Sequence, residues 1–197
     1  MTRVRVNVKR KFLPHILLQR SVWHHLATAE KNQSGCYYEW FAAILSSALC
    51  VEAIGNTYGK VLIPKWKEVI ADLIKKREGA SPVKKLQLVA GRCGIAPDFA
   101  NDPWSTARKL ARFRDLICHA KREPFEFEEY RDLHNYGEAL GTKLEADVEK
   151  TITKDFAKQS CKAVDQIISL FNKTLTDAER YELVLDGHEF TATALND

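Results

Sequence analysis

Residues 112–124, RFRDLICHAKREP, carry the side chains of this sequence whose types and spacing best suit acid–base and phosphate chemistry. The imidazole of His119 titrates near neutral pH, so it can take a proton and return one. Arg114, separated from it by four residues, presents a fixed fork of donors that can hold a phosphate. Asp115 follows the arginine and can orient either side chain. This stretch is the first candidate for a catalytic site.

The spacing of Arg114 and His119 is not diagnostic by itself, because two other pairs repeat it. These are Arg10 with His15 and Arg20 with His25. The first pair straddles the end of a predicted strand, and the second lies inside a predicted helix, whereas Arg114 and His119 close the last turns of an amphipathic helix. On an ideal helix the two side chains are rotated by roughly 140°, so a kinked last turn or a partner chain has to bring them together.

Basic residues crowd around this stretch and give it a local positive charge. They are Arg108, Lys109, Arg112, Arg114, Lys121 and Arg122, with Asp115 as the main acid among them. Such a patch can attract the phosphate backbone of a nucleic acid. Basic residues near the C-terminal end of a helix also interact favourably with its dipole, so part of the cluster has a purely structural explanation.

The elements that must position these residues are mostly helices. The chain has 197 residues, 45% of them hydrophobic, and a formal net charge of +4, which predicts a single domain over 1–197. Apolar residues at helical spacing predict helices over 16–32, 36–62, 64–77, 82–90, 104–120 and 155–175. The segment 36–62 is apolar on most faces and is expected to be the central helix of a bundle over 14–175. Residues 125–150 are expected to be broken helix or irregular.

Both ends of the chain carry strand patterns. Residues 2–12 alternate apolar and polar side chains, and residues 179–194 form two arms around Asp186-Gly187, a strong hairpin signal. The basic strand and the acidic hairpin can pair, with Arg3 and Arg5 opposite Glu179, Glu182 or Glu189. The expected fold class is therefore mainly α, a helical bundle with a small terminal β-sheet made of the N-terminal strand and the C-terminal hairpin.

Several kinds of site lack support in the sequence. Five cysteines are scattered without a CxxC pair, which argues against a disulfide framework and a zinc site. Phosphate-binding loops of the GxxxxGK[ST] or GxGxxG type and the Glu-x-x-His pairs of di-iron bundles do not occur. The longest apolar run, Trp40 to Val51, is too short to span a bilayer. We expect a cytoplasmic protein that needs no metal or cofactor and binds no membrane.

Residues 114–119, RDLICH, resemble the RxxxxH signature of the HEPN superfamily of all-helical proteins. Residues 49–56, LCVEAIGN, are similar to a Glu and Asn pattern on an earlier core helix of many of these domains. The resemblance covers residues 15–175 as an order of helices, with Asp115 where Asn is commoner. It implies a homodimer in which two copies of the motif line one cleft.

The resemblance also implies a metal-independent endoribonuclease. Its catalytic residues would be Arg114, His119 and Asp115, and the surrounding Arg108, Lys109, Arg112, Lys121 and Arg122 would bind RNA. One imidazole would take the proton of the 2′-hydroxyl while another group protonates the leaving 5′-oxygen, which leaves a cyclic phosphate. Proteins of this superfamily often serve as toxins or defence nucleases, restrained by an antitoxin that is frequently a minimal nucleotidyltransferase.

An alternative from another functional class is a helical module that binds a protein or a nucleic acid without cleaving it. In that case Arg114 and His119 cap a helix, and Glu52 and Asn56, one helical turn apart, form a structural network. Convergence of Arg114 and His119 from two chains on a positively charged groove favours the nuclease. Burial of His119 against its own chain favours the binding module.

Overall fold

The helices of this protein form a bundle. The computed structural model describes residues 4–10, 12–32, 34–76, 79–118, 147–184 and 188–194. The helices in this part are α1 (Pro14–Lys31), α2 (Cys36–Leu62), α3 (Trp66–Lys75), α4 (Pro82–Arg92), α5 (Trp104–Cys118), α7 (Asp147–Lys150), α8 (Lys154–Asn172) and α9 (Asp177–Val184). Most of the segment 125–150, predicted as broken helix or irregular, lies outside the described residues, and α7 is its described end.

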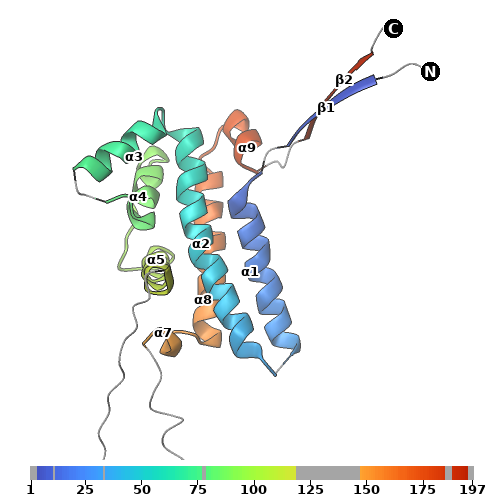
Figure 1. Cartoon of the computed structure of the whole chain (residues 1–197). Coiled ribbons are helices and arrows are strands. Elements are labelled where there is room, and N and C mark those ends of the chain that lie inside the picture. The colour runs from blue at the N-terminus through green and yellow to red at the C-terminus, as the bar shows by residue number, and fades with distance from the viewer. Residues whose placement is uncertain are drawn as a thin grey trace, which may run out of the picture.

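Helix α2 lies at the centre of the bundle, as its composition predicts. It packs against α1, α4, α5, α8 and α9, and Figure 1 shows it between α1 on one side and α4 and α5 on the other. Ala43, Ile44, Val51, Ile54 and Tyr58 are fully buried along its length. By length and composition α2 is also apolar enough to cross a membrane, alone among the described helices. The apolar run Trp40 to Val51, by itself too short for a bilayer, is part of this longer helix.

Two helix starts that the sequence predicts are confirmed. The Ser81 hydroxyl accepts a hydrogen bond from the backbone N–H of Lys84 at 3.2 Å and caps α4. The Asp102 carboxylate, just before α5, accepts from the backbone N–H of Thr106 at 3.2 Å. The same carboxylate accepts from the Gln159 side chain of α8 at 2.8 Å. Asp102 therefore begins α5 and also joins it to α8.

The predicted C-terminal hairpin is wrong, because its first arm belongs to helix α9. The Glu179 carboxylate accepts from the backbone N–H of Thr176 at 2.8 Å, and the Thr176 hydroxyl accepts from the backbone N–H of Glu179 at 3.3 Å. This reciprocal pair is a capping box, which favours a helix start at this point. Leu183 in the last turn is fully buried. Capping and burial together outweigh the strand pattern around Asp186-Gly187, which lies outside the described residues.

The predicted terminal sheet, made of the N-terminal strand and a C-terminal hairpin, is also wrong. Strands β1 (Val4–Arg10) and β2 (His188–Ala194) form an antiparallel pair, and among the described residues they pair only with each other. Arg5 lies opposite Thr193, so its predicted pairing with an acidic residue is wrong. Figure 1 shows this ribbon extending away from the helices. The fold is mainly helical, and the described helical body contains no sheet because the expected hairpin arm became α9.

His15, at the start of α1, is a histidine in the core. It is 1% exposed, and its ring packs edge-on against that of Tyr58 at a centroid distance of 5.4 Å. Its Nδ1 has no hydrogen-bond partner among the described residues. Burial lowers the pKa of His15 to about 4, and a hydrogen bond with the backbone of Leu183 offsets only part of this effect. The imidazole is therefore neutral when the folded protein is near pH 7.

The buried imidazole predicts a loss of stability in acid. The unfolded chain binds a proton at His15 below about pH 6.5, whereas the folded chain does so only below about pH 4. The free energy of unfolding therefore falls as the pH drops through this window, by up to about 3 kcal/mol from His15 alone. Urea unfolding of wild type and His15→Phe at neutral pH and near the lower limit measures the effect. The wild type should lose more stability on acidification, and an equal loss in both proteins would contradict the assignment.

Candidate functional site

Arg114 lies near the C-terminal end of α5 and is held between two carboxylates. Its Nη2 is 3.1 Å from Oε2 of Glu52 on α2, and its Nη1 is 2.9 Å from Oδ1 of Asp115. The Arg114 side chain is 17% exposed. Its Nε is buried and has no hydrogen-bond partner among the described residues. The guanidinium is thus fixed in orientation and largely withdrawn from water.

Glu52 also contacts a third helix. Nζ of Lys85, on α4, lies 3.6 Å from Oε1 of Glu52, and the Lys85 side chain is 11% exposed. Helix α4 can approach α2 this closely because residue 55 is a glycine: a Cβ there would lie 2.9 Å from the Cβ of Lys85. Lys85, Glu52, Arg114 and Asp115 therefore form a row of alternating charges that joins α4, α2 and α5.

The predicted partner of Arg114 in catalysis, His119, lies outside the described residues. It follows Cys118, which is the last residue of α5 and is exposed. Lys121 and Arg122, predicted to bind RNA, also lie outside the described part of the chain. The convergence of Arg114 and His119, and the burial or exposure of His119, stay predictions.

The other predicted RNA-binding residues lie on α5, on a different face of the helix from Arg114. Arg108, Lys109 and Arg112 are exposed. Lys109 and Arg112 line a cavity of about 410 Å³ between α5 and the start of α8. Arg112 and Arg114 are two positions apart, a rotation of roughly 200° on a helix, so they project from nearly opposite faces. The predicted basic patch is therefore divided between two faces of α5.

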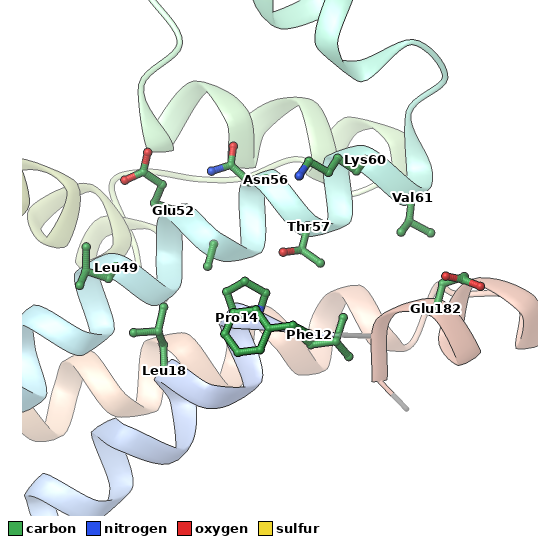
Figure 2. Close-up of a pocket in the computed structure, with 12 residues that line it drawn as sticks. Phe12, Pro14, Leu18, Leu49, Glu52, Asn56, Thr57, Lys60, Val61 and Glu182 are labelled. Carbon is green, nitrogen blue, oxygen red and sulfur yellow. The ribbon is translucent and has the colours of Figure 1, made fainter. Parts of the chain in front are cut away.

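A second, larger cavity adjoins the Arg114 network on the side of α1 and α9. Its volume is about 740 Å³. Figure 2 shows Glu52, Asn56 and Lys60 following one another along α2, with Pro14 and other apolar side chains opposite. Glu52 therefore belongs both to the cavity wall and to the ion pair with Arg114.

Of the two residues predicted to form a structural network, Glu52 and Asn56, only Glu52 forms ion pairs with neighbouring helices in the described residues. Asn56 lines the cavity, and no ion pair or hydrogen bond among the described residues joins it to Glu52. Neither Lys85 nor the cavity was predicted from the sequence. Neither has a local signal, because Lys85 lies thirty-three positions from Glu52 in the sequence and only helix packing brings them together.

No group of three or more His, Cys, Asp or Glu side chains in the described ranges is placed to hold a metal ion. Comparison with protein-family models, with curated proteins and with solved structures finds no match to this chain. The chemistry of the site therefore follows from its own residues. An arginine held by carboxylates can bind one anionic group through its remaining donors.

The two carboxylates at Arg114 should differ in their contribution to stability. Glu52→Ala removes the carboxylate that faces Lys85 and leaves Arg114 with Asp115 alone. Because both cationic side chains are mostly buried, the substitution should lower the free energy of unfolding by about 1–3 kcal/mol. Asp115→Ala is the matched control: its carboxylate is 53% exposed, and its loss should cost less than about 1 kcal/mol. Urea unfolding measures both. A cost at Asp115 equal to or above that at Glu52 would contradict the network.

Proposed function

We propose that this protein is a HEPN-like, metal-independent endoribonuclease that acts in the cytoplasm. The observation that carries the proposal is the ion pair between Arg114 and Glu52 at 3.1 Å. These two residues come from residues 114–119 and 49–56, the two segments on which the sequence resemblance rests. A contact between them supports the proposal because it gives the arginine one orientation before any substrate binds, and preorganised charge is the main source of transition-state stabilisation.

In the proposed reaction, the imidazole of one His119 takes the proton of the RNA 2′-hydroxyl. The 2′-oxygen attacks the adjacent phosphorus, the bond from phosphorus to the 5′-oxygen breaks, and the departing oxygen receives a proton from a second acid. The products are a 2′,3′-cyclic phosphate and a free 5′-hydroxyl. Arg114 binds the phosphate oxygens as their charge grows, and Asp115 and Glu52 hold its guanidinium in place.

The same proposal includes a second copy of the chain. Arg114 and His119 are rotated by roughly 140° on one straight helix, so a homodimer offers a way to supply the arginine of one chain and the histidine of another to the same phosphate. A toxin or defence role, with a minimal nucleotidyltransferase as antitoxin, belongs to the proposal through the resemblance alone.

A second candidate function is a non-catalytic helical module that binds a protein or a nucleic acid. It is favoured by the compensation of the Arg114 charge, since Glu52 and Asp115 already face it at 3.1 and 2.9 Å. In this second candidate, the paired charge of Arg114 has one role, which is to join α5 to α2. In that case Arg114 is part of the packing and no phosphate is cleaved.

Cleavage of mixed RNA in excess EDTA separates the two functions. Wild type should cut RNA and leave cyclic phosphate ends, while His119→Ala and Arg114→Ala should each lose at least about 100-fold in rate. Arg20→Ala and His25→Ala are matched controls, because these residues have the same spacing but lie on α1. Both controls should cut at the wild-type rate.

All five proteins are compared below their unfolding temperatures, with far-UV circular dichroism to establish that each is folded. No cutting by wild type, or equal cutting by wild type and the His119 and Arg114 variants, would overturn the nuclease and favour the binding module.

A further inference from the structure

The cavity between α5 and the start of α8 has the composition of an anion site with an apolar floor. The volume of this cavity is about 410 Å³. Lys109 and Arg112 line it from α5, and Lys150 lines it from α7. Its apolar lining consists of Phe113, Leu116 and Phe156. Leu116 is 47% exposed, so this part of the apolar lining is open to solvent.

The described lining of this cavity carries positive charge. Among the described residues no acidic side chain lines it. Among the described residues, the side chains of Lys109 and Arg112 have no ion-pair partner, and both residues are exposed. An exposed arginine without a carboxylate partner keeps its planar fork of donors available for a phosphate.

The larger cavity beside Glu52 has a different charge. Among the described residues its lining includes Glu52, Glu182 and one cation, Lys60. Because Lys85 and Arg114 already pair with Glu52, this lining offers a phosphate fewer cations, and the cavity is the weaker candidate for an anionic ligand in spite of its size of about 740 Å³.

We propose that the cavity lined by Lys109, Arg112 and Phe156 binds one nucleotide of a single-stranded RNA. The two cations hold the phosphate, and the base lies against the apolar floor, a combination used widely to bind single strands. The inference rests on the proposed function for its choice of RNA as substrate. Because Arg112 and Arg114 project from different faces of α5, this is an anchoring site separate from the phosphate that Arg114 binds.

RNA fits this cavity better than an acidic peptide does. A carboxylate side chain can meet Lys109 or Arg112, but it brings no flat apolar group to cover Leu116 and Phe156. A nucleotide carries both parts in one unit.

Binding is measured in the His119→Ala background with EDTA present, so that the RNA stays intact. A labelled single-stranded RNA of about twelve nucleotides is titrated by fluorescence anisotropy. Arg112→Glu should weaken binding by about 10-fold or more, Arg108→Glu by less, and Arg20→Glu on α1 not at all. Arg108 is the matched comparison, because it lies one helical turn from Arg112, is also exposed and does not line the cavity.

The dependence of RNA affinity on salt concentration gives the number of contacts between the protein and phosphate groups. Replacing Lys109 and Arg112 together by Ala should reduce the slope of log affinity against log salt concentration by about 1.4, since each contact with a single strand contributes about 0.7. Inorganic polyphosphate and polyglutamate of equal charge serve as competitors. Both should compete at least about 10-fold less well than unlabelled RNA, because neither carries a base.

The results also separate this inference from the nuclease. Binding that depends on Arg112, in a protein whose wild type cuts no RNA, would support the site and overturn the proposed reaction. Cutting by wild type with equal weakening by Arg108→Glu and Arg112→Glu would overturn the site and leave the reaction standing. Polyglutamate or polyphosphate competing as well as RNA, or no RNA binding at all, would also overturn the site.

Discussion

The burial of α2 is the constraint on which the rest of this structure depends. Its side chains are apolar on most faces, so that α1, α4, α5, α8 and α9 all have to pack against it to remove that surface from water. Each covering helix needs only one apolar stripe of its own for this purpose, and its other faces are left for polar and charged side chains. The candidate sites lie where such faces meet at the edges of the bundle.

Glu52 is a charged residue of α2 that lies where α4 and α5 pack against this helix. A carboxylate between two helices costs free energy unless opposite charges meet it, and Lys85 and Arg114 do so from α4 and α5. The buried apolar stripe of α5 sets the rotation of this helix about its axis, and in that rotation Arg114 faces Glu52. With Arg114 turned toward α2, Lys109 and Arg112 line the opposite side of α5, near α7 and α8. Helical spacing therefore divides the basic residues of α5 between two separate environments, the ion pair with Glu52 and the cavity.

The helices could be predicted from the sequence because their signals are local. Ser81 and Asp102 cap the helices that follow them, and apolar spacing marks the buried stripe of each helix. The hairpin prediction failed where two local signals competed. Thr176 and Glu179 form a capping box three residues apart, and this pattern, visible in the sequence, indicates a helix over the arm that we assigned to a strand. Burial of Leu183 then favours the helix.

The sequence by itself determined that Arg114 and Asp115 lie near the end of an amphipathic helix, and that basic residues surround them. Only the tertiary structure decided which of these charges are paired and which are free. Helical spacing sets the direction of each side chain relative to its own helix axis, but not the rotation of that helix against its neighbours. That rotation depends on contacts such as Gly55 against Lys85 and Glu52 against Arg114, whose partners are distant in the sequence and are brought together by the packing of α4 and α5 on α2.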